Sequence, residues 1–251
     1  MNLDWLDLAV YLWLGCGLVA FPFLMRITAP YGRHTTATFG PVMSNRWGWT
    51  LMELPVLVLF VYFVLTGTAE KTAVFWVIFG LFVSHYLHRS LIFPWRTHTQ
   101  GKVIPVAIVF AAVVFNLING SINGLWLGNF RDYPLTWFKD MRFVGGTILF
   151  LSGAIINFKA DETLIGLRRP GETGYKIPYG GLFEQISCPN LFGEMVQWWG
   201  FALLCWNPAA LSFAVWTTVN LVPRAKDHHR WYRRTFPDYP EKRKIILPRI
   251  W

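Results

Sequence analysis

The sequence predicts an all-α protein that crosses a membrane with seven helices. Only 15% of the 251 residues are charged and 54% are hydrophobic, whereas about a quarter of the residues in a soluble domain carry charge. The chain also has 14 Trp residues, and Trp is enriched where the bilayer meets water because its ring has one apolar and one polar side.

Seven apolar segments account for the predicted helices. They cover residues 5–25, 49–66, 73–93, 103–118, 143–158, 191–206 and 208–222. A membrane-spanning helix needs about 20 residues, so the first four fit best and the last three are short. Asn207-Pro208 separates the last two segments, and an Asn-Pro pair marks a turn, so we expect a helical hairpin there.

The distribution of basic residues gives an orientation. The loops after the first, third and fifth segments and the C-terminal tail together contain 19 of the 23 Lys and Arg residues. Basic residues accumulate on the cytoplasmic side of membranes, so we expect the N-terminus outside and the C-terminus in the cytoplasm. With an even number of spans, the loops rich in Lys and Arg would not all lie on one side of the membrane.

The three cysteines, Cys16, Cys188 and Cys205, lack the spacing of metal ligands. We interpret them as small core residues and expect no disulfide. Asp4 and Asp7 stand where a cleavable signal peptide would carry basic residues, so we expect no such peptide.

Residues 156–194 form the most unusual part of the chain. The stretch lies between apolar segments, yet it contains acidic and basic residues, glycines, prolines and aromatic residues. Aromatic and charged groups on a long loop indicate an ordered binding surface, because long loops in compact proteins are either functional or disordered. The alternative is a simple connector at the membrane surface.

Polar residues inside the apolar segments indicate a functional site. Glu53 lies in the second segment, where a carboxylate costs a few kcal/mol and is a functional candidate by default. An ion pair with Arg89 is the structural alternative. Tyr86 shares a helix face with Arg89 because the two are three residues apart. The same spacing between His85 and His88 favours a hydrogen-bonded core pair, and we expect no metal site.

Two further pairs of polar residues lie at helix ends. Asn157 and Asp161 are four residues apart, as are Asn190 and Glu194, so each pair projects from one helix face. Asn190 is alternatively an N-cap residue. The predicted topology puts these residues, Glu53, Tyr86 and the tail in the same half of the membrane. We therefore expect one site that opens to the cytoplasm.

The residue types of this site suit a nucleotide cofactor and a ketone. Arg side chains bind phosphates, and carboxamides and acids suit ribose hydroxyls or a nicotinamide carboxamide. The chain has no glycine-rich Rossmann motif, no phosphate loop and no Gly-x-Ser-x-Gly motif. Glu53 and Tyr86 could donate hydrogen bonds to a substrate carbonyl in a dry chamber and stabilise the charge that develops on its oxygen.

Several motifs match one known family. They are Leu-Arg-Arg-Pro-Gly-Glu-Thr-Gly-Tyr-Lys-Ile-Pro-Tyr-Gly-Gly-Leu-Phe at 167–183, Asn190 with Glu194, Arg-Ala-Lys-Asp-His-His-Arg-Trp-Tyr at 224–232, Phe-Pro-Asp-Tyr-Pro at 236–240, Glu-Leu-Pro at 53–55 and His-Tyr-Leu-His-Arg at 85–89. With them the chain resembles the steroid 5α-reductases, or 3-oxo-5α-steroid 4-dehydrogenases, as a bacterial or divergent member. The resemblance implies a single seven-helix membrane domain that uses NADPH to reduce the 4,5 double bond of a 3-oxo-steroid. The steroid pocket would lie mainly in residues 1–122 and the NADPH region mainly in 157–251.

The resemblance also implies roles for individual residues. Glu53 and Tyr86 correspond to the catalytic pair at the steroid 3-ketone. The residues expected to bind NADPH are Asn157, Asp161, Arg168, Tyr175, Lys176, Asn190, Glu194, Arg224, His228 and Tyr232. Two positions depart from the familiar animal enzymes: Met52 replaces a Gln, and Lys176 replaces an Arg and so loses the two-pronged guanidinium.

Three other functions remain open at this point. The chain could reduce another lipid alkene, such as a polyprenol or an enoyl thioester, could be an isoprenylcysteine-type methyltransferase, or could be a transporter. As partners we expect a steroid-like substrate and membrane lipids but no nucleic acid, and we expect a monomer. The bacterial inner membrane and the endoplasmic reticulum both suit a cofactor site that faces the cytoplasm.

Overall fold

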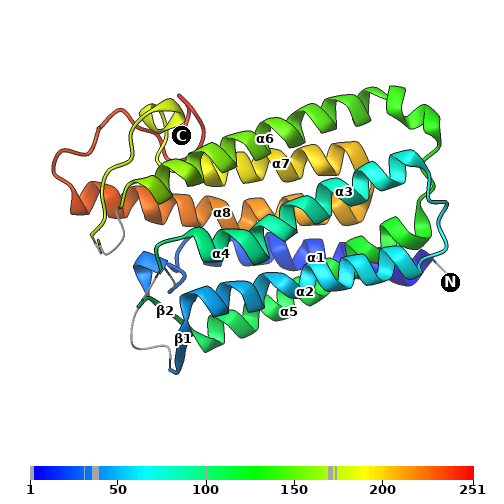
Figure 1. Ribbon diagram of the computed structural model, residues 1–251, viewed down its shortest axis with the longest axis horizontal. Helices are drawn as coiled ribbons and strands as arrows, with labels where there is room; N and C mark the ends of the chain where they lie inside the picture. The colour runs from blue at the N-terminus through cyan, green and yellow to red at the C-terminus, as the bar shows by residue number, and fades with distance from the viewer. Residues whose placement is uncertain (1–2, 31, 36–39, 100, 169–171, 173) are drawn as a thin grey trace. The chain divides into compact units, whose positions relative to one another are not determined.

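The computed structural model describes residues 3–30, 32–35, 40–99, 101–168, 172 and 174–251 (Figure 1). The chain forms two compact units. Unit 1 contains Met1–Val10 and Ala29–Asp140, and unit 2 contains Tyr11–Thr28 and Met141–Trp251.

The described residues are mostly helical. The α-helices are α1 (Leu3–Leu24), α2 (Asn45–Thr66), α3 (Ala73–Leu87), α4 (Phe93–Arg96), α5 (Val106–Leu125), α6 (Met141–Gly166), α7 (Pro189–Cys205) and α8 (Pro208–Thr235). Two π-helical segments, η3 (His88–Ile92) and η4 (Trp126–Phe130), extend α3 and α5, and 3-10 turns cover Gly32–His34, Leu135–Lys139 and Gly181–Glu184. The strands β1 (Val42–Ser44) and β2 (Val103–Pro105) pair antiparallel, with Met43 opposite Ile104.

All seven predicted segments form helices, and five described helices are long and apolar enough to cross a membrane. These are Trp5–Leu24, Asn45–Thr66, Ala73–Arg96, Val106–Phe130 and Met141–Gly166. The predicted hairpin at Asn207-Pro208 is also present, because α7 ends at Cys205 and Asn207 caps α8 by accepting a hydrogen bond from the Ala210 N–H at 2.8 Å.

Several predicted boundaries were wrong because helices continue where hydrophobicity ends. The fifth segment was expected to stop at residue 158 but α6 continues to Gly166, and the seventh was expected to stop at residue 222 but α8 continues to Thr235. The fourth starts as strand β2 and runs on through η4. The interpretation of Cys16 as a core residue was also wrong: Cys16 is exposed, whereas Cys188 and Cys205 are buried.

Glycines bring the helices of unit 1 together. A Cβ atom on Gly120 of α5 would lie within 3.0 Å of the Val56 backbone on α2. A Cβ atom on Gly124, one turn further along α5, would lie 3.1 Å from the Phe60 backbone. Small residues at this spacing let two helix backbones approach closely, which is the usual way that helices associate in membranes.

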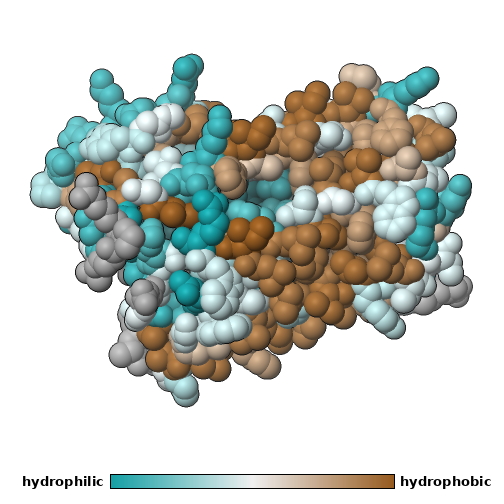
Figure 2. Space-filling view, in the orientation of Figure 1, coloured by the Kyte–Doolittle hydropathy of each residue, from teal (hydrophilic) through white to brown (hydrophobic). Residues whose placement is uncertain are grey.

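Unit 2 has a similar seam between α6 and α7, made by four glycines. Gly146 and Gly153 of α6 are seven residues apart, as are Gly193 and Gly200 of α7, and a Cβ on any of them would come closer than 3.0 Å to backbone of the other helix. Figure 2 shows hydrophobic side chains along the helices and hydrophilic ones around the loop and tail of unit 2, at the left of the view.

The seam predicts opposite effects on thermal stability when two different glycines of α6 are replaced by alanine. Gly153→Ala would push the added methyl group into backbone atoms of α7, and overpacking of this kind costs about 1–3 kcal/mol. Gly145→Ala meets only the Leu203 Cδ2 atom at 3.8 Å, and Ala favours a helix over Gly by about 1 kcal/mol. Thermal unfolding in detergent should therefore show a lower Tm for Gly153→Ala and an equal or higher Tm for Gly145→Ala. Equal Tm values for the two variants would contradict the seam.

Candidate active site in two parts

In unit 1, two aromatic contacts define the facing surfaces of α2 and the continuous helix α3–η3–α4. The Phe60 ring of α2 stacks on the Phe82 ring of α3 with centroids 3.7 Å apart. Nearer the start of α2, the Trp49 ring lies 5.1 Å from the guanidinium carbon of Arg89. The two helices therefore face each other from one contact to the other.

Glu53 and Tyr86, the predicted catalytic pair, lie between these two contacts. On α2, Glu53 is four residues after the tryptophan of one contact and seven before the phenylalanine of the other. On the facing helix, Tyr86 is four residues after Phe82 and three before Arg89. Tyr86 is only 3% exposed and Glu53 is partly exposed. The structure thus brings the pair to the same stretch of two packed helices.

The backbone around Tyr86 departs from an α-helix. Directly after α3 the chain becomes π-helical, and the Ser90 hydroxyl donates a hydrogen bond to the Tyr86 carbonyl oxygen at 2.5 Å. The Tyr86 ring packs on Phe82 and His85 with centroids 4.9 and 5.0 Å away. π-Helical turns inside α-helices occur frequently at functional sites, and here the turn follows the candidate catalytic tyrosine.

Buried asparagines of α5 were missed by the sequence analysis. Asn116 donates a hydrogen bond to the Met52 carbonyl oxygen at 2.5 Å, next to Glu53, and so holds this part of α2. Asn123 donates to the side-chain oxygen of Asn119, which is 1% exposed, at 3.1 Å. The sequence shows these asparagines at i, i+3 and i+7 in an apolar stretch, a spacing that places them near one helix face. The predicted segment ended at residue 118 and so contained only the first of them.

In unit 2, three predicted cofactor residues are joined by hydrogen bonds. Asn157 of α6 donates to the Asn190 carbonyl oxygen at 2.9 Å, and the Asn190 amide donates to Asp161 Oδ1 at 3.1 Å. Asn157 and Asp161 are buried. The alternative of Asn190 as an N-cap was wrong: Cys188 precedes the helix, Pro189 opens it, and the Asn190 side chain reaches across to α6.

The second half of α8 contributes three more predicted residues. Arg224, His228 and Tyr232 are spaced four apart on one side of the helix. Arg224 is 8% exposed and Tyr232 is buried, although both lie in a polar segment. Because α8 continues to Thr235, these residues have fixed positions on a helix instead of belonging to an irregular tail.

The loop between α6 and α7 folds onto α8 through aromatic rings. The Arg168 guanidinium carbon lies 5.7 Å from the centroid of the Tyr175 ring, and that ring contacts Trp231 of α8 edge to face at 5.0 Å. The buried Arg168 Nη1 has no hydrogen-bond partner in the described part of the chain. Arg168 and Tyr175 therefore lie beside the second half of α8, the part of that helix that contains Arg224, His228 and Tyr232.

The remaining two predicted cofactor residues are Lys176 and Glu194. Lys176 is exposed and forms an ion pair with Glu172 at 2.6 Å, so the structure does not bring its ammonium group into the buried cluster. Glu194 lies on α7 one turn after Asn190 and is partly buried. Among the described residues, no group of three His, Cys, Asp or Glu side chains is arranged to hold a metal ion.

Arg243 is a candidate that the sequence analysis missed. Its side chain is 2% exposed, and the guanidinium carbon lies 4.8 Å from the ring centroid of Tyr179 and 5.2 Å from that of Tyr239. None of its three side-chain nitrogens makes a hydrogen bond of good geometry with the described residues, although Arg243 lies close enough to the Tyr239 hydroxyl to lower the pKa of that group. A buried arginine in this condition is suited to an anion, because its N–H groups are oriented and desolvated.

A hydrogen-bonded network holds the tail beside this arginine. The Ser187 hydroxyl lies 2.6 Å from His229 Nδ1 and 2.7 Å from the Tyr239 hydroxyl. The Ser187 N–H also donates to the Lys244 carbonyl oxygen at 2.9 Å. Burial raises the pKa of the Tyr239 hydroxyl, and its hydrogen bond with Ser187 acts in the opposite direction.

The network predicts a pH dependence of stability. Burial lowers the pKa of the His229 imidazole below its usual 6.5, and the charge of Arg233 lowers it further. The unfolded chain therefore takes up a proton first as the pH falls below 6.5, and stability decreases until the pH reaches the lowered folded pKa. His229→Asn keeps a neutral hydrogen-bonding group at the Nδ1 position. Its Tm should fall less than that of the natural protein between about pH 7.5 and about pH 5.5. A parallel decrease in both proteins would contradict the assignment.

Comparisons with known proteins show the family of the chain. Residues 102–251 match the family model described as 3-oxo-5-alpha-steroid 4-dehydrogenase. The chain is 39% identical to 3-oxo-5-alpha-steroid 4-dehydrogenase 1 of Bos taurus, covering 97% of this chain and 96% of the relative. It is 38% identical to the Homo sapiens protein of that name, over 95% and 92% of the two chains. Identity to steroid 5-alpha-reductase DET2 of Gossypium hirsutum is 37%, over 90% and 89%.

The resemblance inferred from the motifs is therefore confirmed, and it extends over nearly the whole chain. The apolar helices agree with an integral membrane protein. The chain belongs to the 3-oxo-5α-steroid 4-dehydrogenase family of membrane oxidoreductases.

Proposed function

We propose that this protein reduces the 4,5 double bond of a 3-oxo-Δ4-steroid to the 5α-3-oxosteroid with NADPH as the reductant. The observation that carries the proposal is the near full-length similarity to relatives named for this reaction. The position of Glu53 and Tyr86 on facing stretches of α2 and α3 supports it. Membership of an oxidoreductase family argues against the methyltransferase and transporter alternatives.

Tyr86 and Glu53 act on the ketone in this proposal. The Tyr86 hydroxyl donates a hydrogen bond to the 3-keto oxygen, and Glu53 supports that donor. As electron density moves toward the oxygen, C5 of the enone becomes electron-poor and accepts hydride, and C4 then takes a proton. Low exposure of the Tyr86 ring favours this role, because hydrogen bonds to developing charge are stronger in dry surroundings.

The residues of unit 2 fit NADPH as the cofactor. Phosphate oxygens would satisfy the buried N–H groups of Arg168 and Arg243 that make no hydrogen bond of good geometry with the described residues. Arg224 adds a further buried cation. Asn190 and Asp161 offer amide and carboxylate groups that suit hydroxyls. Bound NADPH would supply the hydride, and the protein would orient it and exclude water.

We also propose the orientation that the basic residues predict. All seven main helices would cross the membrane, with the N-terminus outside and the C-terminus and cofactor residues in the cytoplasm. α7 has 17 residues, which at 1.5 Å per residue gives about 25 Å and suits a helix that stays partly shielded by its neighbours. The apolar first half of α8 would complete the hairpin.

The catalytic pair can be tested with two conservative variants. Tyr86→Phe removes one hydroxyl and Glu53→Gln removes the carboxylic acid, and each keeps its packing volume. Loss of a donor to developing charge costs about 2.7–4 kcal/mol of barrier, so kcat should fall on the order of a hundredfold or more in each. Steady-state kinetics with a 4-ene-3-ketosteroid should show little change in NADPH affinity.

Thermal unfolding of the same variants distinguishes a structural role. If Glu53 served only an ion pair with Arg89, Glu53→Gln would lower the Tm and Tyr86→Phe would keep near-normal turnover. Near-normal turnover of Tyr86→Phe would overturn the assigned role of the hydroxyl.

The cofactor can be tested through the arginines. Arg168→Ala and Arg224→Ala should raise the KM for NADPH, because each removes a cation that would pair with phosphate. Arg234→Ala removes an exposed cation from the end of α8 and should leave that KM unchanged. The natural protein should also prefer NADPH to NADH. Equal use of the two cofactors would show that the cations serve another anion.

A further inference from the structure

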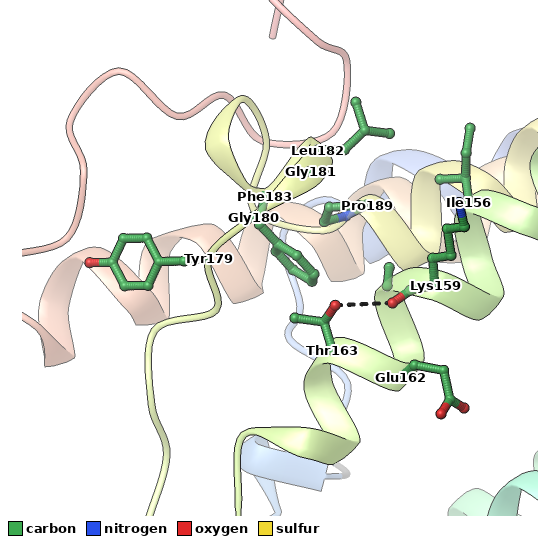
Figure 3. Close-up of a pocket in the computed structure, with 11 residues that line it drawn as sticks. Ile156, Lys159, Glu162, Thr163, Tyr179, Gly180, Gly181, Leu182, Phe183 and Pro189 are labelled. Atoms are coloured by element: carbon green, nitrogen blue, oxygen red, sulfur yellow. Dashed lines mark hydrogen bonds between the residues drawn. The ribbon is translucent and has the colours of Figure 1, made fainter.

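A cavity lies beside the end of α6 in unit 2, along a part of the helix surface that does not include Asn157 and Asp161. It has a volume of about 550 Å³ and lies between the end of α6 and the loop from Tyr179 to Phe183 (Figure 3). In Figure 3 the Phe183 ring points from this loop toward α6. Apart from three polar side chains on α6 and the hydroxyl of Tyr179, the lining is apolar and includes Ile156 and Leu182.

The helix geometry separates this cavity from the cofactor cluster. Lys159 and Thr163 line the cavity, whereas Asn157 and Asp161 make the hydrogen bonds to Asn190. Residues two positions apart on an α-helix point in directions about 200° different. Asn157 and Asp161 therefore do not line the cavity, although Tyr179, which does line it, also contacts Arg243.

An exposed apolar stripe leads along α6 to the cavity. Ile148, Leu151, Ile155 and Phe158 are all exposed and are spaced three or four residues apart, so they share one face of the helix. This helix is apolar and long enough to cross a membrane. In a membrane the stripe would therefore face acyl chains, and the next residues on this helix face are Lys159 and Glu162.

The charge at the end of the stripe suits an anion. The Lys159 side chain is exposed, and no ion pair engages its ammonium group in the described part of the chain. The Thr163 hydroxyl already donates to the Lys159 carbonyl oxygen at 3.0 Å. The third polar residue, Glu162, points its carboxylate away from the loop in Figure 3. Lysine next to the acyl-chain region reaches toward lipid phosphates.

We propose that this cavity binds an anionic phospholipid, with its phosphate at Lys159 and one acyl chain along the stripe of α6. Residues 179–183, which line the cavity opposite α6, belong to the loop that leads into α7. A bound lipid would therefore contact both this loop and α6 and hold them together. The inference requires only that the chain lies in a membrane and is independent of the proposed reaction.

The test is lipid binding by the purified, delipidated protein, measured by native mass spectrometry. The ligands are phosphatidylglycerol, phosphatidylcholine with the same acyl chains, and glycerol 3-phosphate without chains. We expect phosphatidylglycerol to be retained in preference to the other two. One lysine near anionic lipid is worth about fivefold in affinity, so Lys159→Gln should weaken this binding about fivefold. Lys242→Gln, on the exposed tail of the same unit, is the matched control and should change nothing.

A second variant tests the cavity itself. Ile156→Trp fills the cavity without changing charge and should also reduce binding of phosphatidylglycerol, and the Tm of each variant in detergent checks that it is folded. Equal retention of phosphatidylcholine, or equal weakening by Lys159→Gln and Lys242→Gln, would overturn the proposal. Binding of glycerol 3-phosphate as tight as that of the lipid would identify a site for soluble anions instead. None of these measurements depends on turnover.

Discussion

Direct contact between the backbones of α6 and α7 is the constraint on which the rest of unit 2 depends. The glycines at the seam leave no room for a Cβ atom on either helix. At Gly193 the nearest atom across the seam is the backbone nitrogen of Asn157. The short asparagine side chain therefore reaches the Asn190 carbonyl oxygen, which a wider helix separation would put out of range.

Unit 1 uses the same combination of small residues and asparagine. Gly120 brings α5 against the Val56 backbone, and Asn116, one turn earlier, donates to the Met52 carbonyl oxygen. In each unit an asparagine amide binds a main-chain oxygen of the neighbouring helix. Since an unpaired polar group costs several kcal/mol in an apolar interior, these bonds determine how each helix pair is aligned as well as how closely it packs.

The sequence predicted the helices and the family but not the helix ends or all of the site. Hydrophobic runs reveal the buried or lipid-facing part of a helix, so α6 and α8 were cut short where their side chains become polar. Asp161 and Arg224 were therefore expected at or beyond a helix end. The Asn190 cap was wrong for a different reason, because its true partner is 29 residues away in sequence.

Arg243 shows a second limit of sequence reasoning. Arg243 is one of nine basic residues in the tail, and the sequence analysis used these residues only to orient the chain in the membrane. Nothing in the local sequence distinguishes a buried arginine from an exposed one. Its burial arises when Tyr179 and Tyr239, 60 residues apart in the numbering, close on it from two segments. The motifs that revealed the family are contiguous, whereas this contact depends on the fold. The assigned roles of the individual site residues remain predictions.

The bridge between Ser187 and Lys244 has a consequence for biosynthesis. α6 and α7 are synthesised before Lys244, so the loop ahead of α7 waits for its hydrogen-bond partner. The helices of unit 2 can insert and pack as they emerge, but the serine network and the aromatic enclosure of the arginine close only after the tail has been made. A nascent chain stalled before residue 239 would therefore lack both this network and the enclosure of Arg243.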